Sequence, residues 1–210
     1  MKLQIALDDI TLERAIDIVE QAKDYVDIIE VGTPMVIEYG MHAVRTLKKH
    51  FPDKEILADL KIMDAGYYEA AEALKAGADY ITVLGVTDDL TVKACVDAAN
   101  EYHGQAVVDM ICVSDLERRI QTMEELGAHF VSVHVGVDQQ AAGRTPLDDL
   151  KIMKACTKTA KVSVAGGINE KTMASYCALR PEVVIVGSGI IHAKDPAMAA
   201  KALKDAMPAD

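Results

Sequence analysis

Short apolar runs alternate with longer amphipathic stretches from residue 3 to residue 206 of the sequence. The apolar runs are rich in Val, Ile and Leu without polar alternation, which is typical of parallel strands covered on both faces. Parallel strands need long crossover connections, so this pattern restricts the chain to α/β folds. We expect eight strands, at Leu3–Leu7, Ile28–Val31, Ile56–Leu60, Tyr80–Leu84, Ala106–Met110, Phe130–His134, Val162–Ala165 and Val183–Val186.

The stretches between the strands have apolar residues at spacings of three and four, which predicts helices packed by one face. Thr11 is placed to cap the start of the first helix, and Gly77 and Gly127 follow the ends of two others. The expected helical segments lie near Leu12–Lys23, Pro34–His50, Tyr67–Ala76, Asp88–Glu101, Asp115–Leu126, Pro146–Thr157, Lys171–Leu179 and Pro196–Ala206.

The strand–helix units follow one another without a linker, a charge block or a low-complexity tract. Eight units in 210 residues allow about 26 residues each, which suits a small closed (β/α)₈ TIM barrel. An open, doubly wound sheet is the competing arrangement. The unbroken alternation favours the barrel, as a single domain over residues 1–210.

Composition narrows the partners and the compartment. A net charge of −11 argues against binding nucleic acid through its phosphates, although backbone N–H groups can still hold a phosphorylated small molecule. No apolar run approaches the roughly 20 residues that a membrane span needs, and Met1–Ile5 lacks signal-peptide features. The four cysteines are widely spaced, which favours small apolar fillers over disulfides or zinc ligands. We therefore expect a cytoplasmic protein without a membrane partner.

Ionisable residues gather where the expected strands end. In a (β/α)₈ barrel the carboxyl ends of the strands meet at one mouth, where active sites form. The segment Ala58–Asp64 is the densest case, because Asp59 and Lys61 share one strand face and Asp64 follows in the loop. The complete set at the predicted mouth is Asp8, Glu30, Asp59, Lys61, Asp64, Asp109 and His134.

These residue types suggest roles. Glu30 and Asp59 lie on neighbouring strands and form a plausible oxygen-ligand pair for Mg²⁺, whereas zinc would call for clustered Cys or His. Lys61, surrounded by carboxylates, should stay charged, which suits hydrogen bonding better than Schiff-base chemistry. His134 is the natural proton carrier near neutral pH.

Two glycine-containing loops predict a phosphate site. Gly166-Gly167 follows the seventh strand, and Gly187-Ser188 follows the eighth. Barrels commonly bind phosphate on these two loops, because glycine lets backbone N–H groups approach the phosphate oxygens.

With these residues, the whole chain resembles the 3-hexulose-6-phosphate synthases of the orotidine-monophosphate decarboxylase barrel superfamily. The resemblance implies a Mg²⁺-dependent aldehyde-lyase of the ribulose monophosphate pathway. Such an enzyme condenses formaldehyde with D-ribulose 5-phosphate through an enediolate, giving D-arabino-3-hexulose 6-phosphate. The resemblance is carried by the D-x-K-x-x-D string within Ala58–Gly66 and by the segments Tyr25–Pro34, Val83–Gly85, Val133–Asp138 and Val164–Ile168.

The resemblance also implies a role for each residue. It makes Glu30 and Asp59 the Mg²⁺ ligands and sends Asp64 across the interface of a homodimer into the partner's site. It places Asp8 and Lys61 on the substrate hydroxyls and the metal surroundings, makes Asp109 and His134 the acid/base pair, and assigns the phosphate to Gly166, Gly167, Gly187 and Ser188.

Two alternatives remain open. The 3-keto-L-gulonate-6-phosphate decarboxylases share the D-x-K-x-x-D string, but typically have Glu at the position of Asp109, Arg at that of Ser188 and an Arg-containing loop after His134. This chain has Val135–Asp138 in that loop. A non-catalytic phosphosugar-binding barrel would be expected to have lost part of the ionisable set, which is complete here.

Overall fold

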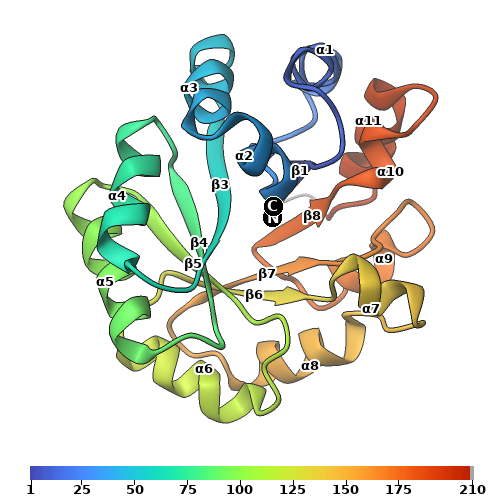
Figure 1. Ribbon diagram of the computed structural model, residues 1–210. Coiled ribbons are helices and arrows are strands. Elements are labelled where there is room, and N and C mark those ends of the chain that lie inside the picture. Colours follow the sequence, from blue (N-terminus) through green and yellow to red (C-terminus); the bar gives the residue numbers. More distant parts are fainter. Residues whose placement is uncertain (209–210) are drawn as a thin grey trace.

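The computed structural model describes residues 1–208. Eight parallel strands close into a barrel, which Figure 1 shows inside a ring of helices. Each strand pairs with the next one in sequence, and β1 pairs with β8, so no open sheet edge is left. This arrangement confirms the (β/α)₈ barrel and excludes the open sheet. The strands are β1 (Lys2–Leu7), β2 (Ile28–Val31), β3 (Glu55–Ile62), β4 (Tyr80–Leu84), β5 (Gln105–Asp109), β6 (Phe130–His134), β7 (Lys161–Ala165) and β8 (Val183–Val186).

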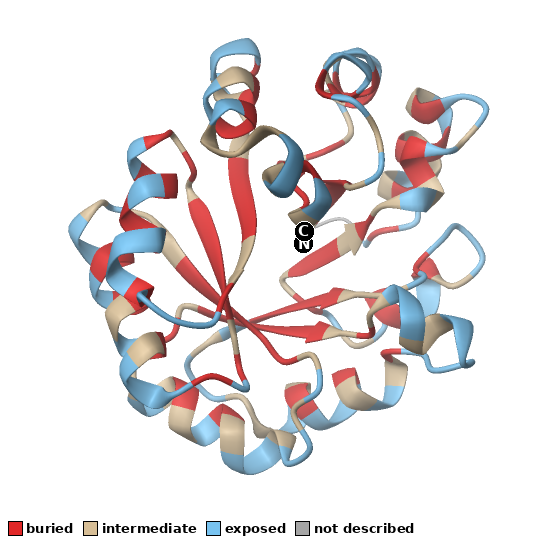
Figure 2. Cartoon of the chain, viewed as in Figure 1, coloured by how far each residue is buried: buried red, intermediate tan, exposed pale blue. Residues whose placement is uncertain are grey.

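The helices pack their apolar faces onto the outside of the barrel, and Figure 2 shows buried residues on the strands and along the inner sides of the helices. In the described part of the chain, no helix is both long enough and apolar enough to cross a membrane. The helices are α1 (Leu12–Ala22), α2 (Thr33–Tyr39), α3 (Met41–His50), α4 (Gly66–Lys75), α5 (Asp89–Glu101), α6 (Leu116–Glu125), α7 (Val137–Ala141), α8 (Leu147–Cys156), α9 (Met173–Cys177), α10 (Ser188–Ile191) and α11 (Pro196–Asp205).

The expected helix caps are confirmed. The Thr11 hydroxyl accepts a hydrogen bond from the Arg14 amide at 3.3 Å, and Gly77 and Gly127 have φ angles of +107° and +84° after their helices. The single helix expected over Pro34–His50 was wrong, because Gly40 adopts φ +56° and divides it into α2 and α3. The short helices α7 and α10 were not predicted, since four or five residues show no helical periodicity.

The interior of the barrel changes from apolar to polar along its axis. One apolar layer fills the lower interior, formed by Ile28, Leu57, Tyr80, Val107, Phe130 and Val183. Side chains two residues further along a strand point to the same interior. On β2 to β6 these next residues are Glu30, Asp59, Thr82, Asp109 and Ser132, all of them buried. The strand period therefore builds a polar layer directly above an apolar floor, at the end of the barrel where the site forms.

Candidate active site

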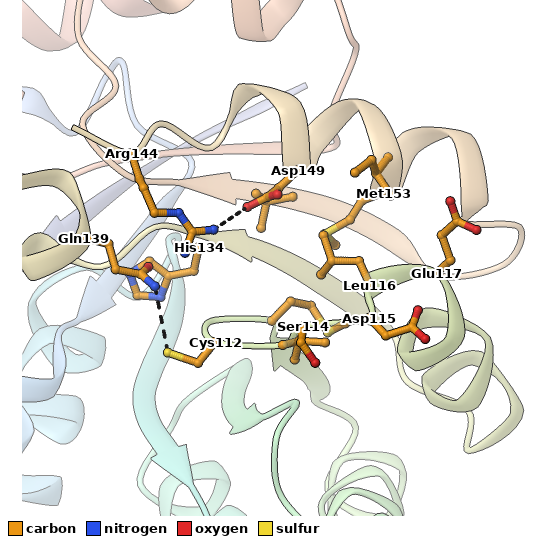
Figure 3. Close-up of a pocket in the computed structure, with 14 residues that line it drawn as sticks. Cys112, Ser114, Asp115, Leu116, Glu117, His134, Gln139, Arg144, Asp149 and Met153 are labelled. Atoms are coloured by element: carbon orange, nitrogen blue, oxygen red, sulfur yellow. Dashed lines mark hydrogen bonds and ion pairs between the residues drawn. The ribbon is translucent and has the colours of Figure 1, made fainter. Parts of the chain in front are cut away.

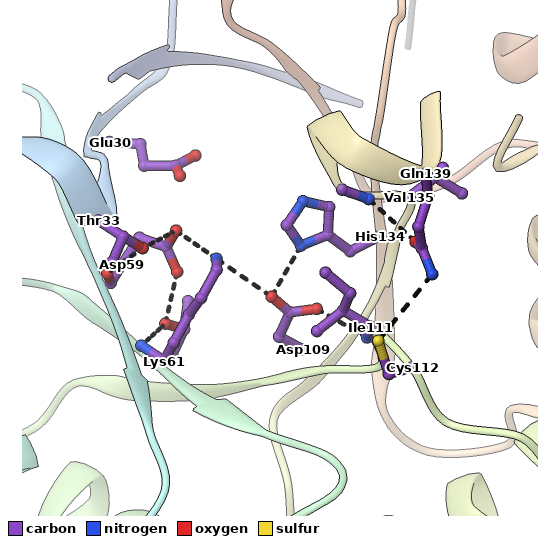
Figure 4. Close-up of polar contacts among 12 residues, drawn as sticks. Glu30, Thr33, Asp59, Lys61, Asp109, Ile111, Cys112, His134, Val135 and Gln139 are labelled. Atoms are coloured by element: carbon purple, nitrogen blue, oxygen red, sulfur yellow. Dashed lines mark hydrogen bonds and ion pairs between the residues drawn. The ribbon is translucent and has the colours of Figure 1, made fainter. Parts of the chain in front are cut away.

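Four ionisable side chains form a continuous chain across the barrel mouth (Figure 4). The Lys61 Nζ atom lies 2.6 Å from Asp59 Oδ2 and 3.3 Å from Asp109 Oδ2. The same Asp109 oxygen lies 2.8 Å from His134 Nδ1. Strands β3, β5 and β6 thus contribute alternating acidic and basic groups to one polar network.

A local irregularity in β3 delivers Lys61 to this network. The register of β3 with β4 shifts between Ala58 and Ile62, and Lys61 has φ +48°, which is uncommon for a residue with a side chain. The Thr82 hydroxyl holds the irregularity, because it accepts from the Lys61 amide at 2.9 Å and donates to Asp59 Oδ1 at 2.7 Å. The contact between Asp59 and Lys61 was predicted from regular strand alternation. In the structure, it is the irregularity in β3 that brings Lys61 to Asp59.

Electrostatics set the charge of Lys61 and of Asp109 in this network. Burial favours a neutral Lys61, but the charges of Asp59 and Asp109 outweigh it and raise the pKa of the ammonium. Burial opposes ionisation of Asp109, yet the hydrogen bond with His134 and the charges of His134 and Lys61 lower the pKa of its carboxyl group. Lys61 is therefore charged near neutral pH, as expected, and is unsuited to forming a Schiff base.

The ionised Asp109 also determines the tautomer of His134. A carboxylate can only accept, so Nδ1 of the imidazole is the nitrogen that carries a proton and donates to Asp109. The other Asp109 oxygen accepts from the Ile111 amide at 2.9 Å. Nε2 of the neutral imidazole is then left to take up a proton, which is the arrangement of an oriented general base.

Glu30 and Asp59 lie beside this network, and each is only 7% exposed. Gln4 Nε2 donates to Glu30 Oε2 at 2.6 Å, and the Thr33 hydroxyl donates to Asp59 Oδ2 at 2.8 Å. These contacts fix the direction of both carboxylates, and Asp59 also accepts from the Thr82 hydroxyl and the Lys61 ammonium. A buried carboxylate pair needs a compensating positive charge.

The charge balance at this pair favours a bound cation. Burial and the charges of Asp59 and Asp8 raise the pKa of Glu30 well above its usual value, and burial and the charge of Asp59 raise that of Asp8. Lys61 and the His134 imidazole face four carboxyl groups here, those of Asp8, Glu30, Asp59 and Asp109. In residues 1–208, no group of three or more His, Cys, Asp or Glu residues is arranged to hold a metal. Two carboxylate ligands fit Mg²⁺, which commonly completes its coordination with water and substrate oxygens.

The Glu30→Gln substitution is expected to stabilise the metal-free protein increasingly as pH rises. The raised pKa means that folded Glu30 keeps a proton above pH 4.5, where an unfolded glutamate has lost it. Its contribution is fully present below that pH and is lost as pH rises through the folded pKa. Melting curves in EDTA from pH 4.5 to about 8 should show a widening gap between the variant and the wild type. A gap that is independent of pH would contradict the assignment.

Asp8 is fixed by the close approach of two glycines. A side chain at Gly32 would place its Cβ 2.1 Å from Asp8 Oδ1, and one at Gly187 would lie 3.4 Å from Asp8 Oδ2. Asp8 therefore occupies space between the ends of β2 and β8, next to the predicted phosphate loop. This position fits a residue that contacts the substrate.

The two predicted phosphate loops lie side by side. Gly166 and Gly167 have φ angles of +127° and +67°, which favour glycine at both positions. A side chain at Gly166 would also approach the Val135 carbonyl oxygen to 2.8 Å. An added Cβ at Gly189, next to Ser188, would lie 3.3 Å from the Ile168 oxygen, which brings the second loop against the first.

Asp64 is the one predicted catalytic residue that this chain does not bring to the network. Its side chain is exposed, and Oδ1 accepts from the amide of Ala65 at 2.7 Å. Ala65 itself has φ +51°, so the turn after β3 adopts a conformation that is unusual for alanine.

A cavity of about 740 Å³ opens beside His134, between the ends of β5 and β6 and helices α6 and α8 (Figure 3). Gln139 and Arg144 line it, together with Cys112. The Gln139 side chain contacts Cys112 Sγ at 3.9 Å. The cavity reaches His134 but none of Glu30, Asp59 and Lys61, so it adjoins the network rather than containing it.

Sequence reasoning missed several groups that orient the predicted ones. Gln4 and Thr82 are polar residues inside otherwise apolar strands, and Thr33 begins the helix after β2. A buried polar residue within an apolar strand was the available indication for the first two. Nothing in the local sequence distinguishes Thr33 from an ordinary residue of the first helical turn.

Comparison with known proteins places this chain in a family. The sequence matches the orotidine 5'-phosphate decarboxylase / HUMPS family over residues 1–203. The chain belongs to this family. It is 46% identical over 207 residues to a 3-hexulose-6-phosphate synthase of Staphylococcus haemolyticus, covering 99% of each chain.

Solved structures of the family agree with the fold. A 3-hexulose-6-phosphate synthase from Salmonella typhimurium is similar at a TM-score of 0.97 and 52% identity, covering 99% of this chain and 98% of the other. A 3-keto-L-gulonate-6-phosphate decarboxylase from Vibrio cholerae is similar at 0.86 and 29%, covering 98% and 96%. The relatives are named as enzymes, which indicates that this barrel is an enzyme as well.

Proposed function

We propose that this protein is a 3-hexulose-6-phosphate synthase, which joins formaldehyde to D-ribulose 5-phosphate and yields D-arabino-3-hexulose 6-phosphate. The observation that carries the proposal is the chain of contacts from Asp59 through Lys61 and Asp109 to His134, beside the buried Glu30. The identity of 52% to a synthase of known structure supports the choice of reaction. The proposed compartment is the cytoplasm.

Mg²⁺ is the proposed cofactor, with Glu30 and Asp59 as its protein ligands. When bound, it would supply Lewis-acid neutralisation of the negative charge that develops on the substrate oxygens. Lys61 adds a fixed positive charge in the same place, because its ammonium is held between Asp59 and Asp109. Positive charge that is in place before the reaction costs little reorganisation during it.

His134 is the proposed base. Its Nε2 would remove the proton from C1 of ribulose 5-phosphate, which leaves an enediolate whose C1 attacks the formaldehyde carbon. The C=O π electrons move onto the formaldehyde oxygen, and that oxygen takes up the proton from the His134 imidazolium. Asp109 keeps the imidazole oriented and stabilises its charged form through the bond to Nδ1.

The substrate phosphate is assigned to the Gly166-Gly167 and Gly187-Ser188 loops. The two loops contact each other, and Gly166 and Gly167 have positive φ angles. Without side chains in the way, the backbone N–H groups of these glycines can approach phosphate oxygens at the barrel mouth. Asp8, next to Gly187, would then contact a hydroxyl of the sugar.

Decarboxylation of 3-keto-L-gulonate 6-phosphate is the second candidate, because the relatives with that name share the fold. Asp109, Ser188 and the segment Val135–Asp138 occupy the positions where the resemblance predicts Glu, Arg and an Arg-containing loop in the decarboxylases. Purified protein with Mg²⁺ should consume formaldehyde and ribulose 5-phosphate together, and should release far less CO₂ from the keto-gulonate phosphate. A faster decarboxylation than condensation would overturn the proposal.

A homodimer with shared active sites is also proposed. Asp64 has no contact with the network of its own chain, and the exposed apolar residues Met63, Tyr67 and Tyr68 lie next to it in sequence. Exposed apolar side chains grouped around one segment are typical of an interface. Asp64 of each subunit would then complete the site of the other.

Mixing two inactive variants is expected to restore activity. Lys61→Ala inactivates the active site of the subunit that carries it, whereas Asp64→Ala inactivates the active site of the partner subunit. Equal mixing should recover about a quarter of wild-type turnover, because half of the dimers are mixed and each holds one intact site. Sedimentation of the wild type and melting curves of both variants are the controls. A fully active monomer would contradict the shared site.

A further inference from the structure

Arg119 of α6 binds the loop between β4 and α5 through three contacts. Its Nε donates to the Gly85 carbonyl at 2.6 Å, and one terminal nitrogen, Nη2, donates to the Thr87 carbonyl at 2.8 Å. The other terminal nitrogen, Nη1, pairs with the Asp89 carboxylate at the start of α5. The Arg119 side chain is 19% exposed and that of Asp89 is 53% exposed, so the bonds to the two carbonyls are better protected from water than the ion pair. One guanidinium thereby fixes three consecutive parts of the same loop.

The loop that Arg119 fixes contacts two other segments of the mouth. The Gly85 amide donates to the Asp109 carbonyl at 2.7 Å, at the end of β5. A Cβ at Gly85 would come within 3.1 Å of that carbonyl, a tight approach that favours glycine. The buried Thr87 hydroxyl donates to the Met63 carbonyl at 2.6 Å, directly before Asp64. The loop therefore connects the backbone of one proposed catalytic residue to that of another.

We propose that Arg119 and Thr87 are positioning residues that hold the Asp64 segment in the direction needed to reach the partner's site. This inference rests on the proposed function, with its shared sites. The segment needs external support because Ala65 has φ +51° and the Asp64 side chain accepts its hydrogen bond from the adjacent Ala65 amide. The Met63 carbonyl is the last anchored group before that turn, and Thr87 is its partner.

The geometry explains why arginine occupies position 119. The planar guanidinium presents several N–H donors in fixed directions, so it can bond two carbonyls and a carboxylate at once. A lysine ammonium carries the same charge but cannot reproduce this fork. Exposed loops at a barrel mouth otherwise open at low free-energy cost. The Arg119 guanidinium takes the place of water as hydrogen-bond donor to the Gly85 and Thr87 carbonyls, and the Thr87 hydroxyl does the same for the Met63 carbonyl.

Thr87→Val is the sharpest substitution, because it removes the hydroxyl and keeps the shape of the side chain. Loss of one hydrogen bond should speed amide exchange in residues 63–66 about two- to tenfold and lower turnover by a similar factor. Thr87→Ser keeps the hydroxyl and should behave like the wild type. Arg119→Lys should resemble Thr87→Val, whereas Arg118→Lys at the exposed neighbouring position is the matched control. Unchanged exchange in Thr87→Val would overturn the inference.

Mixed dimers distinguish an effect of Thr87 on the partner's active site from general damage to its own subunit. If Thr87 acts on the partner's site, a Thr87→Val subunit has an intact site whenever its partner carries threonine. Adding the inactive Lys61→Ala protein to Thr87→Val should therefore raise turnover per Thr87→Val subunit severalfold. No increase would mean that Thr87 serves its own subunit, which overturns the inference. Failure of the Lys61→Ala and Asp64→Ala pair as well would identify the shared-site proposal as the source of the failure.

Discussion

Asp59→Asn is expected to reduce turnover by about a thousandfold or more, and removal of divalent cations with EDTA should do the same. Asp59 is buried, and its two oxygens are held by Thr82, Thr33 and Lys61. Asparagine has nearly the same shape, but it carries no charge to bind a cation or to hold the lysine. The loss follows from removing charge stabilisation worth several kcal/mol in a site that excludes water.

Binding and activity should be measured separately. Calorimetric titration with Mg²⁺ should show binding to the wild type and little or none to Asp59→Asn, while melting curves verify that the variant is folded. Asp64→Asn is a useful comparison, because Asp64 is exposed and outside the proposed metal pair. That variant should retain Mg²⁺ binding even if turnover falls. Full turnover after EDTA treatment and in Asp59→Asn would show that the metal assignment is wrong.

His134→Asn should slow exchange of the C1 hydrogen of ribulose 5-phosphate with solvent by about 10²–10⁴-fold, the usual effect of losing a general base. The variant should still bind Mg²⁺ and the sugar phosphate, because His134 contacts Asp109 rather than Glu30 or Asp59. Deuterium exchange followed by NMR measures the proton transfer without the condensation step.

A second histidine provides the control. His103 lies in the loop before β5, at the opposite end of the barrel from the mouth, and has φ +58°, which asparagine tolerates well. His103→Asn should exchange the C1 hydrogen at the wild-type rate. If His134→Asn stays folded and also exchanges normally, the base is not His134, and Asp109 becomes the candidate.

The fold was largely predictable because its determinants are local. Eight apolar runs and the amphipathic stretches between them gave the strands, most of the helices and the closed barrel. The failures fall where one backbone angle decides the outcome, as at Gly40, which divides α2 from α3. A glycine within an amphipathic stretch fits both a continuous helix and a turn.

The candidate site was predictable in its members but not in its connections. Period-two alternation carried Glu30, Asp59 and Asp109 from the apolar floor to the mouth, so their convergence followed from strand register. The bulge at Lys61 and the hydroxyl of Thr82 that holds it depend on contact between β3 and β4. No pattern within either strand contains that contact.

The sequence by itself determined the barrel and the meeting of Glu30, Asp59 and Asp109 at its mouth, because both follow from short-range periodicity along the strands. Only the tertiary structure decided the direction of the proton on His134, the raised pKa of Glu30 and the attachment of the Asp64 segment through Thr87 to Arg119. These properties arise between residues far apart in the chain. Hydrogen-bond geometry and burial, which set them, exist only once the strands have closed.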